Sequence, residues 1–378
     1  MKKNPLVQLS DFGQSVWLDQ IQRSMFRTGE LKRLIEQDGL RGMTSNPTIF
    51  EKAIAGSSDY DQQIRGLASG GATRDQIYDA VVTQDIGQAA DAFRGVYDAT
   101  QGRDGFVSLE VSPLLAHQTE ATLAEARRLF ARLARPNVMI KIPATPEGLP
   151  AIEQAIAEGI NVNVTLIFSA AVYCQVAEVY LRGLEQRAAA GKPVDRVASV
   201  ASFFVSRIDT AVDKLLDEKL KAASEPAQKQ RLTALLGKAA IANAQVAYAA
   251  FEKIFSGPRW QTLEAKGARV QRPLWASTST KNPNYPDVMY AEALIGPHTV
   301  NTLPAPTVDA YRDHGHPAAR LKDGIEKAPE VFTALAQAGI DFKAVTDKLT
   351  ADGVKSFADS FDALLKVVES RRAAAAHV

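Results

Sequence analysis

Short apolar runs alternate along the chain with longer amphipathic stretches, a pattern typical of α/β proteins. The amphipathic stretches predict helices, among them Arg74–Ala99, Gln118–Ala134, Leu149–Glu158, Ala170–Ala189 and Gln228–Phe255. The short runs predict strands at Val16–Asp19, Gly42–Asn46, Phe106–Val111, Val138–Ile142, Asn161–Leu166, Val197–Phe204, Pro273–Ser277 and Thr299–Leu303. Strands that alternate with helices pair in parallel through right-handed crossovers. Eight such units favour a closed (β/α)8 TIM barrel over an open sheet.

Two of the predicted connections are too long for a single helix. Pro47–Gly105 joins the second and third strands and has room for two or three helices, and Val205–Arg272 joins the sixth and seventh through two. The tail, Pro317–Arg371, predicts a helical extension that could pack over the barrel mouth, and residues 373–378 should fray. No stretch rich in Pro, Gly or Ser divides the chain, so we expect one domain over residues 1–378.

The composition indicates a soluble globular protein with a large core. Hydrophobic residues make up 46% of the 378 positions and charged residues 23%. The net charge of +1 at pH 7 shows no basic bias of the kind that nucleic-acid binding requires. No run approaches the ~20 apolar residues that span a membrane, and Met1–Gln14 lacks the apolar core of a signal peptide. We therefore expect a cytoplasmic enzyme without membrane association.

Several cofactor and metal motifs are missing from the sequence. Cys174 is the single cysteine, and its helical surroundings predict a small core residue rather than a nucleophile. No pair of histidines has metal-ligand spacing, so we expect no metal site. Neither G-x-G-x-x-G after the first strand nor G-x-x-x-x-G-K-[ST] anywhere is present, which argues against the common nucleotide-binding folds.

One predicted strand carries a lysine at its centre. The run Val138–Pro143, Val-Met-Ile-Lys-Ile-Pro, has the composition of a strand covered on both faces, yet it includes Lys141. Burying an ammonium group is costly and disfavours its charged form. A neutral amine is a nucleophile that attacks carbonyl carbons. Lys141 is therefore either a structural oddity or a catalytic residue, and the pattern favours the second.

Polar residues alternate with apolar ones in the strands that flank this lysine. The apolar positions of a barrel strand must meet the surrounding helices, so the polar positions point inward. The inward set comprises Ser108, Glu110, Ser112, Asn161, Asn163 and Thr165, with Met139 and Lys141 between them. Asp19, Asn46 and Ser202 also lie late in their strands, where barrel active sites form. Taken singly, these three could be a helix cap, a turn residue and core filling, but the shared pattern favours a site.

These residue types suit imine chemistry. A lysine attacks a ketone, and the resulting protonated imine withdraws electrons so that the adjacent C–C bond can break. The proton transfers need carboxyl groups, for which Asp19 and Glu110 are the inward candidates. Amide and hydroxyl groups at Asn46, Asn163 and Thr165 can orient sugar hydroxyls and a catalytic water.

A phosphate site is indicated where the sixth strand gives way to a helix. Arg207 follows Ser202 by five residues at this junction. An arginine near a helix start suits a phosphate group, which also gains from the free N–H groups there. A surface salt bridge explains Arg207 equally well on this evidence.

Four runs of this sequence resemble the transaldolase family: Thr44–Pro47, Lys141–Pro143, Gly159–Ser169 and Ser202–Arg207. They follow the predicted strand order from about Val16 to Leu303, so the resemblance covers most of the chain. The Gly159–Ser169 run, with two asparagines and a threonine at fixed spacing, and the Lys-Ile-Pro run are together highly specific.

The resemblance implies a role for each candidate residue. Lys141 matches the imine-forming lysine, Glu110 matches a glutamate that works through a water held by Thr165, and Asp19 matches the acid/base of C–C cleavage. The implied substrate ligands are Asn46, Asn163, Ser202 and Arg207. The implied reaction transfers a dihydroxyacetone unit from sedoheptulose 7-phosphate to glyceraldehyde 3-phosphate, giving erythrose 4-phosphate and fructose 6-phosphate. It belongs to the non-oxidative pentose phosphate pathway and needs no cofactor. We expect a monomer or a homodimer.

One stretch departs from the family pattern. Related enzymes place an arginine just after the seventh strand as a second phosphate ligand, whereas this chain reads Trp275-Ala-Ser-Thr-Ser-Thr-Lys-Asn282. Ser277 fits the pattern, but Ser279 stands at the arginine position. Lys281 offers a point charge as a substitute, without the bidentate grip of a guanidinium. The long second connection and the tail indicate a longer subgroup of the family.

Three alternative functions remain open at this point. A fructose 6-phosphate aldolase would use the same imine, but relatives with that activity are shorter, replace the glutamate and carry a tyrosine where Phe204 stands. A metal-dependent aldolase would need clustered histidines. A non-catalytic barrel that binds sugar phosphates would have no reason to keep a lysine beside two inward carboxylates.

Overall fold

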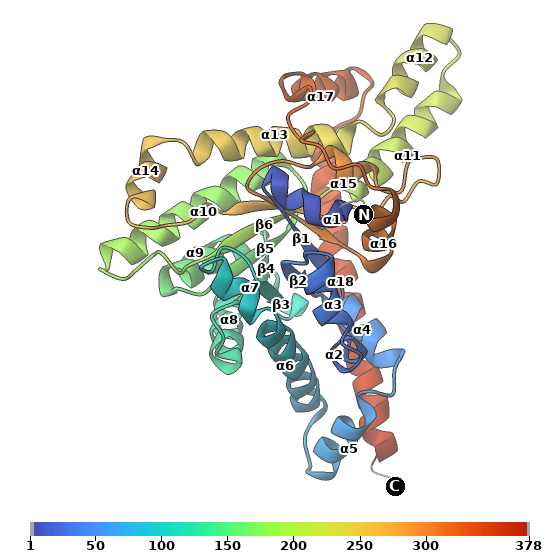
Figure 1. Cartoon of the computed structure of the whole chain (residues 1–378). Coiled ribbons are helices and arrows are strands. Elements are labelled where there is room, and N and C mark those ends of the chain that lie inside the picture. Colours follow the sequence, from blue (N-terminus) through green and yellow to red (C-terminus); the bar gives the residue numbers. More distant parts are fainter. Residues whose placement is uncertain (1–3, 376–378) are drawn as a thin grey trace.

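Eight parallel strands form a closed barrel at the centre of the computed structural model, which describes residues 4–375 (Figure 1). The strand order around the barrel follows the sequence, and β8 pairs with β1 to close it. The predicted (β/α)8 barrel is therefore confirmed. The strands are β1 Gln14–Asp19, β2 Gly42–Thr44, β3 Phe106–Glu110, β4 Val138–Pro143, β5 Val162–Ile167, β6 Ser199–Phe204, β7 Arg272–Ala276 and β8 Thr299–Leu303.

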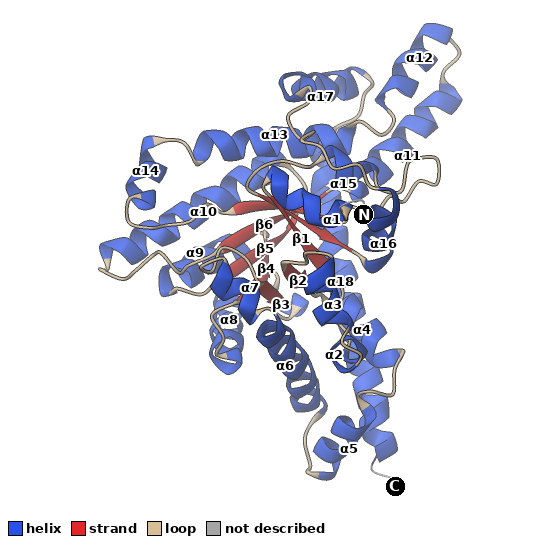
Figure 2. Ribbon diagram, viewed as in Figure 1, coloured by secondary structure: helices blue, strands red, loops and turns tan. Residues whose placement is uncertain are grey.

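Helices surround this barrel, as the blue ribbons around the red strands in Figure 2 show. Up to β6 they are α1 Pro5–Gln8, α2 Arg23–Arg27, α3 Glu30–Gln37, α4 Pro47–Ala55, α5 Asp61–Ser69, α6 Arg74–Ala92, α7 Arg94–Ala99, α8 Thr119–Leu133, α9 Gly148–Glu158 and α10 Ala170–Ala189. After β6 they are α11 Ser206–Ala222, α12 Pro226–Leu235, α13 Ala239–Ile254, α14 Pro258–Glu264, α15 Met289–Ala293, α16 Ala305–His314, α17 Ala328–Gln337 and α18 Phe342–Ala375. Three short 3-10 turns are η1 Leu9–Phe12, η2 Pro113–Leu115 and η3 Ile325–Lys327.

The two long connections contain more helices than we predicted. Four helices, α4 to α7, follow β2, because the expected helix Arg74–Ala99 is interrupted at Phe93. Four helices, α11 to α14, follow β6 instead of two. The expected helix Gln228–Phe255 breaks at Gly237, whose φ of +69° ends the helical path and whose N–H donates to Asp213 Oδ1 at 3.0 Å. The break is thus a specific contact between α11 and the start of α13.

Strand register places the central candidates side by side. Glu110 on β3 pairs with Lys141 on β4, and Lys141 pairs with Asn163 on β5. The regular alternation of β5 ends just after Thr165, because the pairing with β6 shifts there and Leu166 adopts a φ of +59°. Such irregularities redirect side chains and are common beside active sites. Here Leu166 packs near α18, since a Cβ added to Gly353 would lie 2.9 Å from it.

The C-terminal tail is helical, as predicted, and its long helix α18 reaches the carboxyl ends of the strands. Phe357 of α18 lines the same cavity as Lys141. Thr48 Oγ1 on α4 donates to Ser360 Oγ at 2.7 Å, and Arg371 forms an ion pair of 2.6 Å with Asp61 on α5. Figure 1 shows α18, in red, running alongside α4 and α5. The helix continues to Ala375, while residues 376–378 of the tail expected to fray lie outside the described residues.

Cys174 lies on the outward face of α10, so the prediction of a core residue was wrong. The buried positions of this helix include Tyr173, Val176, Ala177 and Tyr180, which follow helical spacing. Cys174 falls between them in sequence but points away from the barrel, because successive helical residues are turned by about 100°.

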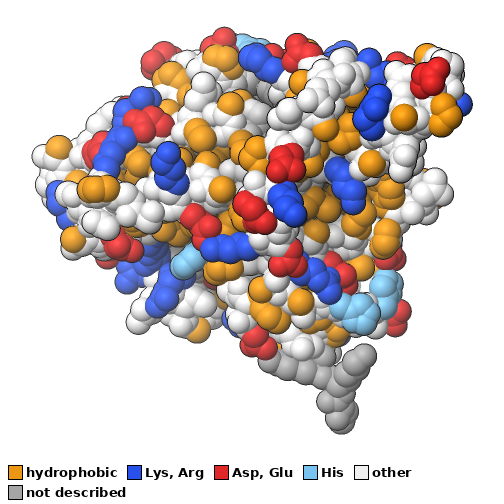
Figure 3. Space-filling view, turned by 90° about the horizontal axis from the view of Figure 1, so that it is seen from above, with side chains coloured by type: hydrophobic (Ala, Val, Ile, Leu, Met, Phe, Trp, Pro, Cys, Tyr) orange, Lys and Arg blue, Asp and Glu red, His pale blue; other side chains and the backbone are white. Residues whose placement is uncertain are grey.

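Acidic and basic side chains are interspersed on the face of the molecule in Figure 3. Within residues 4–375, no helix is both long enough and apolar enough to cross a membrane. The single-domain organisation, the oligomeric state and the cytoplasmic location stay predictions.

Gly42, the first residue of β2, provides a test of barrel packing. A Cβ at this position would lie 2.5 and 2.6 Å from ring atoms of Trp17 and 2.7 Å from the Phe106 carbonyl oxygen. We expect Gly42→Ala to lower the free energy of unfolding by about 1–3 kcal/mol, because neither neighbour can move without disturbing the strands. Urea unfolding checks this value. Gly66→Ala on α5, where nothing lies within 4 Å, is the matched control and should be neutral or stabilising. Equal stability of both variants would contradict the packing argument.

Candidate active site

A cavity of about 320 Å³ opens at the carboxyl ends of the strands. It brings together all the predicted site residues except Glu110 and Asn163. They are Asp19, Asn46, Lys141, Thr165, Ser202, Arg207, Ser277 and Lys281. The inward parity inferred for the strands explains this convergence, since the residues come from six different strands or the segments that follow them.

Lys141 lies at the base of this cavity and is almost fully enclosed. Its side chain is 5% exposed, and Nζ lies 3.3 Å from Glu110 Oε2. Nζ also donates to the Ser45 carbonyl oxygen at 3.2 Å and lies 5.5 Å from the centre of the Phe357 ring. The amine is therefore held at the cavity between a carboxylate, a carbonyl group and an aromatic ring.

Two buried oxygen atoms beside Lys141 lack hydrogen-bond partners among the described residues. Glu110 Oε2 is close enough to Nζ for an ion pair, but the angles are not those of a hydrogen bond, and Thr165 Oγ1 has no partner. Buried polar atoms are normally satisfied by protein or by ordered water. These two atoms are thus the best candidates to hold a water molecule or a substrate hydroxyl near the amine.

Burial raises the pKa of both candidate carboxyl groups. Burial raises the pKa of Glu110, and Lys141 opposes this rise. Burial also raises the pKa of Asp19, although part of its side chain borders the cavity; Lys141 and a 2.6 Å hydrogen bond from Thr44 Oγ1 act in the opposite direction. A raised pKa makes a carboxyl group a better proton donor at a given pH while it can still act as an acceptor, as general acid–base catalysis requires.

The two predicted asparagines differ in their placement. Asn46 caps α4 by accepting from the Ile49 N–H at 3.0 Å, and it also lines the cavity. Asn163 is fully buried: its Nδ2 donates to Ser108 Oγ at 3.0 Å, and its Oδ1 accepts from Ser202 Oγ at 2.6 Å. The structure therefore does not place Asn163 on the cavity wall, and its visible contact is the one that orients Ser202.

Two cations line the opposite side of the cavity. Arg207 is the second residue of α11 and lies over the Phe204 ring, with Cζ 5.2 Å from the ring centre. Lys281 Nζ donates to Ser279 Oγ at 2.7 Å. Burial lowers the pKa of both groups, and Arg207 lowers the pKa of Lys281 further. Neither forms an ion pair within residues 4–375, so Arg207 is not explained by a surface salt bridge. Together they suit an anionic ligand.

The loop that carries Ser277, Ser279 and Lys281 is fixed to α11, the helix that carries Arg207. Ser277 has a φ of +54°, and its carbonyl oxygen accepts from the Ser206 N–H at 3.0 Å. A non-glycine residue in this conformation is strained and persists because its surroundings hold it. Two further hydrogen bonds attach the following segment: Tyr285 to Asp213 at 2.7 Å and Tyr290 to Asp209 at 2.8 Å.

Sequence reasoning missed several residues of the site. Thr44 lines the cavity from the last position of β2. The sequence carried a signal for it, because Thr44 is the first residue of the Thr44–Pro47 run. Phe357 gave no local signal, since α18 is far from the barrel strands in the sequence. Tyr285 and Tyr290, which hold the Lys281 loop, also gave no local signal.

Within the described residues, no group of three or more His, Cys, Asp or Glu side chains could hold a metal ion. The prediction that neither metal nor organic cofactor takes part stays a prediction.

The fold and the site define a (β/α)8 barrel with an enclosed lysine in a cavity at the carboxyl ends of its strands. Comparison with known proteins identifies the family to which this barrel belongs. Residues 16–368 match the family model described as Transaldolase/Fructose-6-phosphate aldolase. A transaldolase of Trichodesmium erythraeum is 48% identical over 373 residues, which cover 98% of each protein. One from Thermobifida fusca is 50% identical, with 98% of this chain and 99% of the relative covered. The chain therefore belongs to the transaldolase/fructose-6-phosphate aldolase family.

Asp209, which holds Tyr290 near the site, should make stability depend on pH. Burial raises its pKa from 3.8 to about 6, so the folded protein binds this proton more tightly than the unfolded chain. Its contribution to stability is complete below about pH 4 and is lost as the pH rises through about 6. We expect Asp209→Asn, which cannot ionise, to remove this loss, on the order of 2–3 kcal/mol.

Thermal unfolding at pH 4, 5, 6 and 7 measures the effect. Asp217→Asn, a neighbouring exposed residue of α11, serves as the control. If both variants follow the pH dependence of the unmodified protein, Asp209 does not titrate as described.

Proposed function

We propose that this protein is a transaldolase that moves a dihydroxyacetone unit from sedoheptulose 7-phosphate to glyceraldehyde 3-phosphate. The products are erythrose 4-phosphate and fructose 6-phosphate. The observation that carries the proposal is the enclosed amine of Lys141, 3.3 Å from Glu110 and in the same cavity as Arg207 and Lys281. The names of relatives that are 48–50% identical over nearly the whole chain support it.

Lys141 and Glu110 carry out imine formation in this proposal. Lys141 Nζ attacks the ketone carbon of the donor sugar, and water leaves as the imine forms. Glu110 exchanges the protons of this step, through a water held between its Oε2 and Thr165 Oγ1. The absence of other partners on these two oxygen atoms within the described residues supports this assignment.

Asp19 carries out the cleavage of the C–C bond. It accepts the proton of the hydroxyl group next to the breaking bond, while the electrons of that bond move into the protonated imine and leave an enamine. The aldehyde product departs, the enamine attacks the acceptor aldehyde, and Asp19 returns the proton. Water then hydrolyses the imine and frees Lys141. The raised pKa of Asp19 suits this alternation between base and acid.

Substrate binding is assigned to the remaining lining residues. Arg207, Ser277 and Lys281 hold the phosphate group, as the unpaired cations and the helix start of α11 indicate. Asn46 and Ser202 contact sugar hydroxyls, and Asn163 acts by orienting Ser202. Phe357 of α18 covers the amine, which limits the access of water to the enamine.

Covalent trapping tests the role of Lys141. Borohydride added with fructose 6-phosphate should reduce the imine and leave one adduct per chain, which peptide mass spectrometry should locate on Lys141. Lys141→Ala should show no adduct, while Lys52→Ala, which removes another lysine of the cavity, should still be labelled on Lys141. An unlabelled Lys141 in folded, substrate-saturated protein would falsify the imine mechanism.

The need for an acceptor separates transfer from simple aldol cleavage, the alternative activity in this family. We expect the protein to consume fructose 6-phosphate rapidly only when erythrose 4-phosphate is present, because the enamine waits for an aldehyde rather than being released. Turnover is followed through glyceraldehyde 3-phosphate, and free dihydroxyacetone is measured in parallel. Equal release of dihydroxyacetone with and without the acceptor would identify an aldolase instead.

A further inference from the structure

A second cavity, of about 580 Å³, lies at the opposite end of the barrel, where the strands begin. We call it the basal cavity; its lining includes Ser15, Trp17, Phe106, Arg103, Arg269 and Arg272. Met139 of β4 also lines it, whereas Lys141, two residues further along the same strand, lines the active-site cavity. The two cavities thus lie at opposite ends of the barrel, and the chemistry proposed above does not use the basal cavity.

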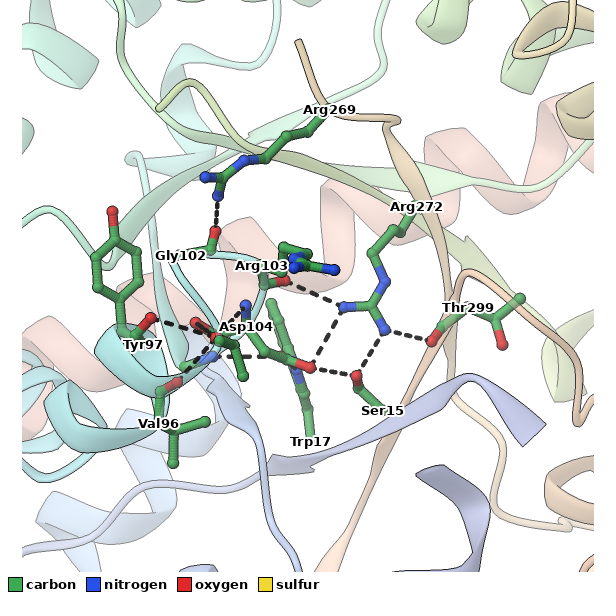
Figure 4. Close-up of polar contacts among 12 residues, drawn as sticks. Ser15, Trp17, Val96, Tyr97, Gly102, Arg103, Asp104, Arg269, Arg272 and Thr299 are labelled. Carbon is green, nitrogen blue, oxygen red and sulfur yellow. Dashed lines mark hydrogen bonds and ion pairs between the residues drawn. The ribbon is translucent and has the colours of Figure 1, made fainter. Parts of the chain in front are cut away.

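Three arginines from separate segments meet at the basal cavity. Arg103 precedes β3, Arg269 precedes β7 and Arg272 is the first residue of β7. Figure 4 shows the Arg103 guanidinium between those of the other two. The lining contains only two carboxylates, Asp104 and Glu264, so the described residues leave an excess of positive charge there.

Two of these arginines have protein partners that explain their positions. Arg272 donates to Ser15 Oγ and to the Thr299 carbonyl oxygen, both at 2.6 Å, and lies 3.4 Å from Asp104 Oδ2. Arg269 donates to the carbonyl oxygens of Gln101 and Gly102. These contacts use two of the five guanidinium donors of Arg269, which leaves others for a ligand.

No protein partner explains the position of the Arg103 side chain. Its side chain forms no ion pair or hydrogen bond among residues 4–375. The nearest acid in sequence, Asp104, is already engaged by Ser15 Oγ, by Trp17 Nε1 at 2.8 Å and by Arg272. Arg103 therefore presents its donors to the cavity without a protein acceptor.

The surroundings strengthen any interaction with an anion. Trp17, Phe106 and Met139 form an apolar floor and are no more than 2% exposed. Burial lowers the pKa of Arg269, and the nearby Arg196 acts in the same direction, whereas Tyr97 and Asp195 oppose this fall. Charge–charge attraction is larger beside low-dielectric protein than in water.

We propose that the basal cavity binds a small metabolite that carries a phosphate group, through Arg103 and the free donors of Arg269. The cavity volume lies within the usual range for small-molecule sites, about 300–1,000 Å³. Guanidinium groups bind phosphate through paired hydrogen bonds. Donors that approach from separate segments suit the three oxygens of a phosphate better than the two coplanar oxygens of a carboxylate.

The test must exclude phosphate binding at the active site. We would use the full-length Arg207→Ala/Lys281→Ala variant as the background, because it lacks the two cations to which phosphate binding in the active-site cavity is assigned. Isothermal titration with pyrophosphate should still give one site per chain. Adding Arg103→Gln should weaken this binding about tenfold or more, which corresponds to the loss of one charge-assisted hydrogen-bond pair. Arg103→Lys should fall between the two.

Arg65→Gln, at an exposed position of α5, provides the same change in net charge as a control and should leave binding unchanged. Loss of all pyrophosphate binding in the Arg207→Ala/Lys281→Ala background would overturn the proposal, as would equal effects of Arg103→Gln and Arg65→Gln. Tighter binding of citrate than of pyrophosphate would overturn the assignment to phosphate.

Since Arg103 makes no contact that the fold depends on, its variants should remain folded, which circular dichroism verifies.

Discussion

The buried pair of Lys141 and Glu110 is the constraint on which the site depends. Removing two opposite charges from water costs several kcal/mol per ion, and their attraction offsets this only if the geometry is good. The closed barrel provides that geometry through register, because Glu110 pairs directly with Lys141 across β3 and β4. A shift of one residue between these strands would turn one partner out towards the helices and leave the other charge buried and alone. The register of β3 and β4 therefore fixes the position of the Lys141 amine relative to Glu110.

The environment of this pair is completed by a helix from the far end of the chain. Phe357 lies over the amine, and contacts such as Thr48 with Ser360 hold α18 against α4. The protein that surrounds the cavity is also what raises the pKa values of Asp19 and Glu110, since burial is the first cause of both rises. Enclosure thus has two consequences with one origin. In the proposed mechanism, enclosure limits the access of water to the carbon bound to Lys141, and burial raises the pKa of the two carboxyl groups to which the proton transfers are assigned.

The sequence predicted the barrel and the convergence of most candidate residues on one cavity, because both depend on strand parity, which is a local property. The alternation around Lys141 located the inward face before any contact was known. Parity could not show that β5 becomes irregular at Leu166, or that Gly237 would end a helix with a positive φ, because both are set by contacts with distant elements. Phe357 could not be predicted for the same reason, because its place in the cavity depends on how the distant helix α18 packs. The same reason also explains the error at Cys174, since a helical pattern shows that one face is buried but not which position ends up outside it.

Two buried carboxylates at opposite ends of this barrel differ in their partners. Asp104, at the amino end of the strands, accepts from Ser15, Trp17 and Arg272, so both of its oxygens are occupied. Glu110, at the carboxyl end, lies beside Lys141 but has a buried oxygen without a hydrogen-bond partner among the described residues. An unsatisfied buried oxygen costs stability unless a bound molecule supplies a donor, and at Glu110 the proposed mechanism provides one in a water molecule.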